Sequence, residues 1–251
     1  MRERVLIGLC LPSGSQSVEL TDWIGALMRA SEDASFPWEF AVDHVARTTP
    51  VAYAENLMVG KFLAGDCDRL WLIPEDMEPH RASHRVLELD ADVALSWTYI
   101  LERDHETPLA ARLVPNFFRA EDETGSGFRP VEFAPDSPVP FAVDAGGMHS
   151  CVIRRRVFCP QMELPRQWVD ALGRPRYLSD DDVGFAVPYF RTEYRPDGRV
   201  GRTDDFDFCW RAKQAGFTVA GHPGAPSGHV KTADVSAFGL MAAKLMREAV
   251  R

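Results

Sequence analysis

The chain has 251 residues, of which 45% are hydrophobic and 26% are charged, as in ordinary folded proteins, so wholesale disorder is excluded. Its formal net charge is −9, because 37 Asp and Glu residues outnumber 28 Lys and Arg residues. This acidic balance argues against a general nucleic-acid or membrane-surface binder. No apolar run approaches the roughly 20 residues that a membrane span requires. The five cysteines show no CxxC spacing, so we expect reduced thiols in a cytoplasmic protein.

The first hundred residues alternate between two hydrophobic patterns. Apolar runs of strand length predict strands, and apolar residues at helical spacing predict helices between them. The expected strands are 5–11, 36–45, 68–74 and 93–99, and the expected helices are 18–30, 52–64 and 83–89. Such alternation predicts an α/β fold with a mixed, mostly parallel central sheet flanked by helices.

The second half of the chain is less regular. Residues 119–140 and 163–203 are rich in Pro and Gly, and we expect loops there, the second of them a candidate lid over a site. The remaining expected elements are strand-like pieces at 141–147 and 151–153, a helix at 204–216, a strand at 217–220 and an amphipathic terminal helix at 235–250. We find no internal repeat, so a single domain over 1–251 is the economical interpretation.

Several nucleotide and hydrolase motifs are absent from the sequence. It contains no GxGxxG after a strand, no GxxxxGK[ST], no GxSxG and no HExxH. A ligand of this α/β sheet is therefore expected to bind at the carboxyl ends of the strands by other means.

An acidic cluster, Glu75-Asp76-Met77-Glu78, directly follows the predicted strand 68–74. Carboxylates in that position point toward the crevice where a ligand lies, and Mg²⁺ or Mn²⁺ prefers such oxygen ligands. The alternative is a solvated acidic turn.

A second cluster, Asp204-Asp205-Phe206-Asp207, opens the predicted helix 204–216. Acidic residues in a first turn stabilise the helix dipole by about 0.3–1 kcal/mol, which explains them structurally. A carboxylate held there could also act as a general base toward a hydroxyl group. Asp180-Asp181-Asp182 has no flanking element and is interpreted as a solvated loop.

A third candidate is Gly228-His229-Val230-Lys231, after the last predicted strand. A His followed two residues later by a Lys could bind a metal ion and a phosphate. A surface loop with a hydrogen-bonded His is the alternative.

In this order along the chain, the clusters resemble those of the GT-A nucleotide-sugar glycosyltransferases, especially the family-2-like inverting enzymes. The resemblance covers about residues 4–232. The segment LWLIPEDM at 70–77 is similar to the family's strand ending in an Asp-x-Asp metal motif, and AEN at 54–56 to its "aRN" helix start. VDAGGMHSCVIRRRVF at 143–158 is similar to the Gly-containing acceptor-side strand. TDDFDFCWRAKQAGF at 203–217, the most specific match, looks like the "EDxdFcxRaxxaG(F/Y)" segment, and GHVK at 228–231 like the closing strand with its His.

The resemblance implies a metal-dependent, inverting transfer of sugar from a nucleoside-diphosphate sugar to an acceptor hydroxyl. In this resemblance the donor would bind to about residues 4–100, and the acceptor side would be formed by about residues 101–232. Residues 233–251 would be a terminal helix. The implied site has Asp205 or Asp204 as base, with Asp205 preferred, and one Mn²⁺ or Mg²⁺ held by Asp76 and His229. The other implied contacts are Pro12, Asn56, Glu75, Asp76 and Lys231 to the donor, and Gly146, Gly147 and His149 on the acceptor side. The sequence does not identify the sugar, the nucleobase of the donor or the acceptor.

Three positions depart from the family pattern. Pro74 replaces the first Asp of the metal motif, Asp204 replaces a Glu, and Glu55 replaces the Arg of "aRN". These changes are compatible with weaker metal affinity, an unusual donor or lost catalysis. Two other functions therefore stay open: a non-catalytic nucleotide-sugar-binding module, and a sugar-phosphate nucleotidyltransferase. The second is disfavoured because residues 12–17 lack the basic loop that such enzymes carry after the first strand.

Overall fold

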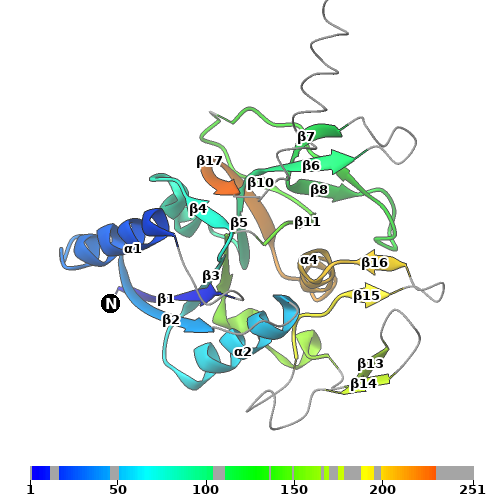
Figure 1. Cartoon of the computed structure of the whole chain (residues 1–251), viewed down its shortest axis with the longest axis horizontal. Coiled ribbons are helices and arrows are strands. Elements are labelled where there is room, and N and C mark those ends of the chain that lie inside the picture. The colour runs from blue at the N-terminus through cyan, green and yellow to red at the C-terminus, as the bar shows by residue number, and fades with distance from the viewer. Residues whose placement is uncertain are drawn as a thin grey trace, which may run out of the picture.

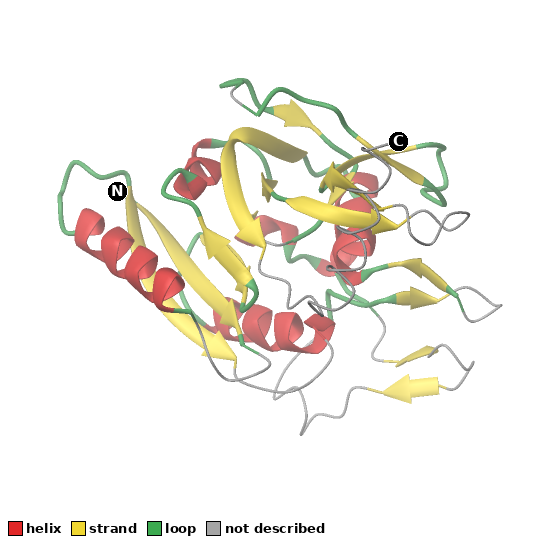
Figure 2. Cartoon of the chain, turned by 45° about the horizontal axis from the view of Figure 1, so that its top comes forward, coloured by secondary structure: helices red, strands yellow, loops and turns green. Residues whose placement is uncertain are grey.

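The computed structural model shows a central sheet with helices packed on both of its faces (Figures 1 and 2). It describes residues 2–11, 17–45, 51–103, 111–135, 137–148, 150–164, 167–169, 175–177, 188–194 and 199–229. The expected terminal helix at 235–250 lies outside these ranges. No helix within them is long and apolar enough to cross a membrane.

The central sheet has eight strands and is mostly parallel, which confirms the predicted α/β class. Its path runs β10-β17-β5-β12-β3-β1-β2, and β4 pairs with β17 off this path. β12 is antiparallel to both of its neighbours, β3 and β5, so those two strands run the same way. The bounds are β1 Glu3–Cys10, β2 Trp38–Val45, β3 Arg69–Pro74, β4 Met77–Pro79, β5 Val93–Trp97, β10 Phe141–Ala142, β12 Cys151–Arg154 and β17 Val219–His229.

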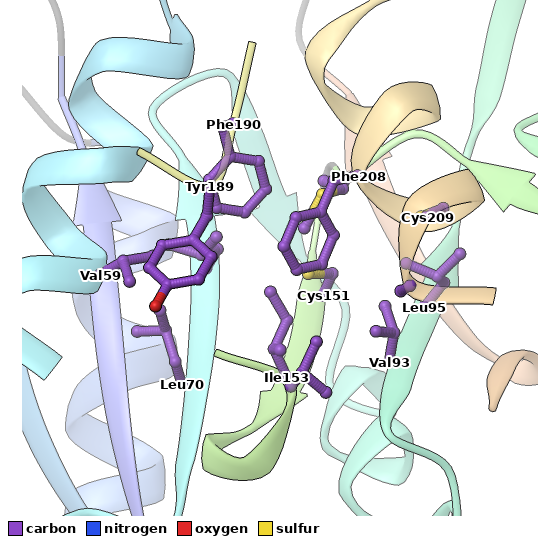
Figure 3. Packing of buried hydrophobic residues seen from close by; sticks show 14 of the residues in the cluster. Val59, Leu70, Val93, Leu95, Cys151, Ile153, Tyr189, Phe190, Phe208 and Cys209 are labelled. Atoms are coloured by element: carbon purple, nitrogen blue, oxygen red, sulfur yellow. The ribbon is translucent and has the colours of Figure 1, made fainter. Parts of the chain in front are cut away.

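Alternate residues of the central strands enter two different cores. In β1, Val5, Ile7 and Leu9 point to one face, where helix α1 (Val18–Ser31) packs. Leu6 and Cys10 point to the other face, which α2 (Val51–Ala64) and α4 (Asp204–Gln214) cover. This period-two burial is what the pleat of a strand dictates when a sheet is covered on both sides. Figure 3 shows the second core, in which the rings of Phe190 and Phe208 stack with centroids 4.4 Å apart.

Local sequence explains the position of α1. Ser17 is the N-cap, and its hydroxyl oxygen accepts a hydrogen bond of 3.0 Å from the backbone N–H of Leu20. Leu20, Trp23 and Leu27 are buried at the spacing of one helix face.

Helix α2 approaches the sheet closely at Gly8. A Cβ atom at this position would lie 2.6 Å from Cγ of Met58, so a glycine is needed there. The close packing holds the middle of α2 against β1.

Smaller sheets lie beside the central one. They pair β11 (Ala145–Gly146) with β8 (Phe117–Ala120) and β9 (Phe128–Pro130), β6 (Tyr99–Arg103) with β7 (Ala111–Pro115), β13 (Gln167–Val169) with β14 (Pro175–Tyr177), and β15 (Glu193–Tyr194) with β16 (Val200–Arg202). Short 3₁₀ helices occur at η1 (Ser83–Glu88), η2 (Arg155–Val157) and η3 (Pro160–Met162).

Some boundaries differ from the prediction. The predicted loop 119–140 contains β9, and the predicted lid 163–203 contains four short strands in its described parts, because backbone pairing there does not need an apolar pattern. The predicted helix 83–89 is the 3₁₀ helix η1. The strand expected at 217–220 continues to His229, so Gly228 and His229 belong to a strand and not to a loop.

Candidate functional site

The carboxyl ends of β1 and β3 form one edge of the sheet. The register pairs Cys10 with Pro74, the last residues of the two strands. The backbone N–H of Glu75 donates to the carbonyl oxygen of Cys10 at 2.9 Å, which holds the following acidic cluster against the end of β1. Glu75 and Asp76 therefore lie at the edge where α/β sheets usually bind ligands.

Asp76 and His229, the predicted metal ligands, are brought together along the backbone. β4 begins directly after Asp76 and pairs antiparallel with the end of β17, and the register places His229 opposite Met77. The distance in sequence between these strands is about 150 residues, so this proximity is a product of the tertiary fold. The side chain of His229 is outside the described part of the structure, as are Pro12 and Lys231.

The described residues suit a divalent cation only in part. Among them, no group of three or more His, Cys, Asp or Glu side chains converges to hold a metal ion. Mg²⁺ is nevertheless commonly bound by one or two protein ligands and completed by substrate phosphates. The Asp76 carboxylate suits such a site chemically, and it would need the diphosphate to complete it.

The N-terminus of α4 presents Asp204 and Asp205. Thr203 is the N-cap residue in extended conformation, and acidic residues in the first turn complement the positive end of the helix. The hydroxyl of Thr203 donates to Oδ1 of Asp205, and the backbone N–H of Phe206 donates to the same oxygen at 2.8 Å. These bonds fix the direction of the Asp205 carboxyl group.

The carboxyl group of Asp205 has a raised pKa. Burial raises its pKa, and the neighbouring charge of Asp204 raises it further, to about 6, although the bonds from Thr203 and Phe206 oppose the shift. A carboxyl group with such a pKa can accept a proton at neutral pH and hold it well, as a general base requires.

A third carboxyl group reaches this point from helix α2. Glu55 is 3% exposed, and its carboxyl group lies close to that of Asp204. Burial, followed by the charge and hydrogen bond of Asp204 and the charge of Asp205, raises the pKa of Glu55 well above its usual value. The site thus contains three carboxyl groups from two helices.

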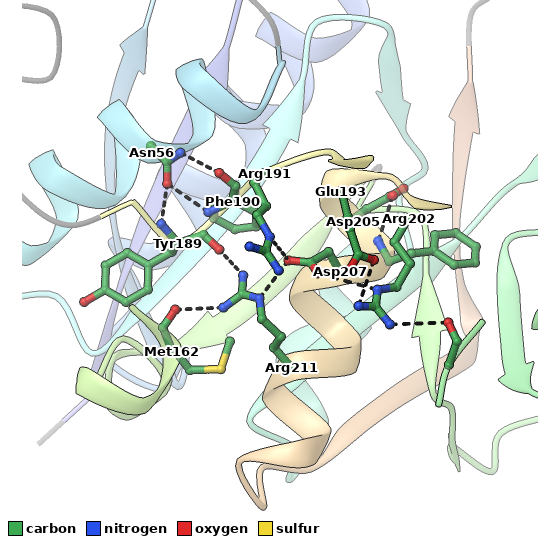
Figure 4. A network of polar contacts seen from close by, with 12 residues as sticks. Asn56, Met162, Tyr189, Phe190, Arg191, Glu193, Arg202, Asp205, Asp207 and Arg211 are labelled. Carbon is green, nitrogen blue, oxygen red and sulfur yellow. Dashed lines mark hydrogen bonds and ion pairs between the residues drawn. The ribbon is translucent and has the colours of Figure 1, made fainter. Parts of the chain in front are cut away.

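Asn56, predicted to bind the donor, uses its side chain within the protein. Its Oδ1 accepts hydrogen bonds from the backbone N–H groups of Tyr189 and Phe190, at 2.7 and 2.9 Å. Its Nδ2 donates to the carbonyl oxygen of Phe190 at 2.9 Å. Asn56 therefore fastens the segment 188–194 to α2, as Figure 4 shows.

The same segment is fastened to α4 by a buried ionic network (Figure 4). Asp207 is fully buried and lies between Arg191, Arg202 and Arg211, with nearest N–O distances of 3.3, 3.5 and 2.7 Å. Arg211 also donates to the carbonyl oxygens of Met162 and Tyr189. This network was not predicted from the sequence, although Asp207 and Arg211 have the i, i+4 spacing of a helical ion pair.

The glycines predicted on the acceptor side lie in the interior. Gly146 and Gly147 are both buried, and a Cβ on Gly146 would lie 2.7 Å from Cδ1 of Leu95 and 2.9 Å from the carbonyl oxygen of Asn116. Gly146 is thus explained by packing beneath α4, where Cys209 contacts its carbonyl oxygen. His149 lies outside the described residues.

Comparisons with known proteins bear on the fold. No known protein-family model matches the sequence, and no curated protein sequence does either. Among solved structures, the chain is similar to A197 from STIV, with a TM-score of 0.50 and 16% identity over 91% of this chain and 86% of that one. It also resembles GalNAc-T7, solved with UDP, GalNAc and Mn²⁺, with a TM-score of 0.46 and 10% identity over 93% of this chain and 44% of that one. The first likeness shows a shared fold and nothing further, and the second is too low to bear on fold or function.

Proposed function

We propose that the chain is a glycosyltransferase that moves a sugar from a nucleoside-diphosphate sugar to an acceptor hydroxyl group, with inversion and with Asp205 as the general base. The observation that carries the proposal is the fixed orientation and raised pKa of the Asp205 carboxyl group. Its carboxyl group is fixed by Thr203 and Phe206 at a helix N-terminus, and its pKa is raised to about 6. The sequence resemblance at 203–217 supports the same role.

The donor would bind at the edge formed by the ends of β1 and β3. Supporting this, Asp76 follows the end of β3 and the backbone of His229 lies beside the next residue. Asp76 and His229 would hold one Mn²⁺ or Mg²⁺ together with the diphosphate oxygens. When bound, the cation supplies positive charge to the leaving diphosphate.

Contacts between the two regions support one continuous site. The end of β1 at Cys10 accepts a hydrogen bond from Glu75, and Glu55 is near enough to Cys10 to raise the pKa of its thiol. Glu55 in turn lies close enough to Asp204 and Asp205 for their charges to raise its pKa. The donor edge and the base are therefore linked through α2 and the first turn of α4.

In the proposed step, Asp205 removes the proton of the acceptor hydroxyl as its oxygen attacks the anomeric carbon. The bond between that carbon and the diphosphate oxygen breaks, and its electron pair leaves with the diphosphate. The protein keeps the base oriented and holds the segment 188–194 against α2 and α4 through Asn56 and Arg211.

A second candidate, a nucleotide-sugar-binding module without turnover, is favoured by one observation. Pro74 occupies the position of the first metal-motif Asp, and the described residues hold no group of three metal-binding side chains. This candidate would bind nucleotides weakly or without metal.

The deciding experiment measures thermal unfolding with nucleoside diphosphates and their sugars, with and without Mn²⁺, together with release of nucleoside diphosphate. A ligand at about 100 times its dissociation constant adds about 2.7 kcal/mol, enough to raise Tm by several degrees. A shift that needs both Mn²⁺ and one nucleotide, with release of that diphosphate, supports the transferase. A metal-independent shift without release supports the binding module. No shift with any donor contradicts both.

A further inference from the structure

Strand β17 leaves its neighbour β5 and rejoins it further along. Residues 219–221 pair in parallel with residues 93–95 of β5, and the pairing resumes only at Pro226, opposite Trp97. The intervening residues of β17 lie beside a single residue of β5, Ser96, so the regular ladder is interrupted there. Backbone pairing does little to fix the point of return, because Pro226 has no N–H group to donate to a neighbouring strand.

Serine hydroxyl groups bind β17 where it returns. The hydroxyl of Ser83 in η1 donates to the carbonyl oxygen of Pro226 at 2.6 Å, and the hydroxyl of Ser96 donates to the carbonyl oxygen of Ser150 at 2.9 Å. The hydroxyl oxygens of Ser96 and Ser227 lie 3.1 Å apart. Because a hydroxyl group has one hydrogen, and that of Ser96 is used for Ser150, Ser227 is the donor in this third bond.

The bond between Ser227 and Ser96 lies in the protein interior. Ser96 and Ser150 are fully buried, and Ser227 is 7% exposed. The backbone N–H of Ser96 also donates to the carbonyl oxygen of Ser150, at 3.0 Å, and the indole N–H of Trp71 in β3 donates to the Ser150 hydroxyl at 2.8 Å. Ser227 is thereby tied to the middle of the central sheet, and a buried hydroxyl that lost its partner would stay unsatisfied.

The residues of β17 that are anchored in this way pair directly with β4. Residues 227–229 lie opposite residues 77–79 in antiparallel register. A Cβ atom on Gly228 would lie 3.1 Å from the carbonyl oxygen of Glu78, so the two strands are in close contact. Asp76 immediately precedes β4. A displacement of β17 relative to β5 would therefore move the end of β17 relative to Asp76.

We propose that Ser227 is a positioning residue: its hydrogen bond to Ser96 fixes where β17 rejoins the sheet and so holds the backbone of His229 beside the residue that follows Asp76. This rests on the proposed function, in which Asp76 and His229 bind one divalent cation. Ser227 acts through its strand and supplies no ligand. Its bond matters because the two ligands come from different strands, whose relative position sets the distance between them.

The first test is amide hydrogen exchange, measured by NMR on the full chain without metal. In Ser227→Ala we expect the protected amides of residues 77, 78 and 227–229 to exchange about fivefold faster or more, while those of β1 keep their wild-type rates. Ser96→Ala breaks the same bond from the other strand and should have the same effect, including where Ser227→Ala does not fold.

Ser150→Ala is the matched control for both variants. It removes an equally buried hydroxyl group, which bonds to Trp71 and not to β17. The carbonyl oxygen of Ser150 that binds Ser96 is retained, so exchange in β4 and at the end of β17 should stay at the wild-type rate. Unchanged exchange in Ser227→Ala, or equal acceleration in Ser150→Ala, would overturn the proposal.

The second test measures the affinity for Mn²⁺ by EPR, in the presence of the nucleoside diphosphate that raises Tm together with Mn²⁺. We expect Ser227→Ala and Ser96→Ala to raise the Kd for Mn²⁺ about 10-fold, and Ser150→Ala to leave it unchanged. A wild-type affinity in Ser227→Ala would overturn the positioning role. If the wild-type chain binds Mn²⁺ with no nucleoside diphosphate, the proposed function and the role of Ser227 toward the cation fall together. Hydrogen exchange then still decides whether Ser227 sets β17 against β4.

Discussion

Asn56 bonds to both backbone polar groups of Phe190: its amide oxygen accepts from the N–H of Phe190 and its amide nitrogen donates to the carbonyl oxygen of the same residue, each at 2.9 Å. The bond from Tyr189 completes the arrangement. A side chain of α2 thereby binds the backbone of residues 189 and 190, just before β15. The segment in turn carries Arg191 into the network of Asp207.

Replacing Asn56 should therefore loosen the segment. Asn56→Leu leaves three buried backbone groups without partners, and we expect the free energy of unfolding to fall by about 3 kcal/mol. Asn56→Asp keeps the accepting oxygen and should lose less. Urea unfolding monitored by Trp fluorescence measures both variants. Equal, small losses would show that the segment does not depend on these bonds.

Asp207 pairs with three arginines, and replacing it should destabilise the folded protein. Asp207→Asn leaves Arg191, Arg202 and Arg211 facing one another without the central charge. We therefore expect the free energy of unfolding to fall by about 3–5 kcal/mol. Asp90→Asn is the matched control, because Asp90 pairs with Arg154 while 96% of its side chain is exposed. Such a pair contributes about 0–1 kcal/mol. Comparable losses for the two variants in urea unfolding would contradict the role given to Asp207.

Asp205→Asn should reduce turnover. A general base contributes about 10²–10⁴-fold, so kcat for sugar transfer should fall by that factor while donor binding is retained. Asp204→Asn is the comparison: it should keep more activity and move the acid limb of the pH profile downward, because the charge of Asp204 helps to raise the pKa of Asp205. Unchanged turnover in Asp205→Asn would remove Asp205 from the mechanism.

The raised pKa of Asp205 also predicts a pH dependence of stability. The folded state binds this proton more tightly than the unfolded state, with pKa values of about 6 and 3.8. Its stabilising contribution is therefore complete below about pH 3.8 and is lost as the pH rises through 6.

The matching experiment compares the wild-type protein with Asp205→Asn by urea unfolding between pH 4 and 7. Stability of the variant relative to wild type should rise with pH and level off above about pH 6. Asp92 and Asp144, whose pKa values are lowered, give the opposite pH dependence in both proteins and cancel in the difference. A flat difference would show that Asp205 titrates normally.

Asp76 should decide the metal dependence of nucleotide binding. Asp76→Asn removes a charged oxygen ligand, and we expect the Mn²⁺-dependent rise in Tm with a nucleoside diphosphate to be lost. The metal-independent part should remain. Glu78→Gln, two residues along in β4, is the control and should behave like wild type. An unaltered Mn²⁺ effect in Asp76→Asn would place the cation elsewhere.

Much of the fold was predictable because its causes are local. The alternation of apolar runs and helical spacing up to residue 99 predicted the α/β class, and the actual bounds of β1, α1 and α2 lie within two residues of the expected ones at either end. The start of α4 at Asp204 follows from Thr203 and the acidic first turn. These patterns depend on neighbours within a few positions, so the sequence by itself determined them.

Contacts across the chain depended on the tertiary structure. The extension of β17 to His229 required the partner β4, about 150 residues earlier, and no local pattern distinguishes such a strand from a loop. Glu55 was noted only as a departure from a motif, because its meeting with Asp204 joins two helices far apart in sequence. Likewise, Asn56 was expected to face a ligand, and only the folded chain shows it bound to Phe190. The role of a buried polar side chain depends on which groups lie within hydrogen-bond distance of it. Those neighbours are set by tertiary packing and not by the local sequence.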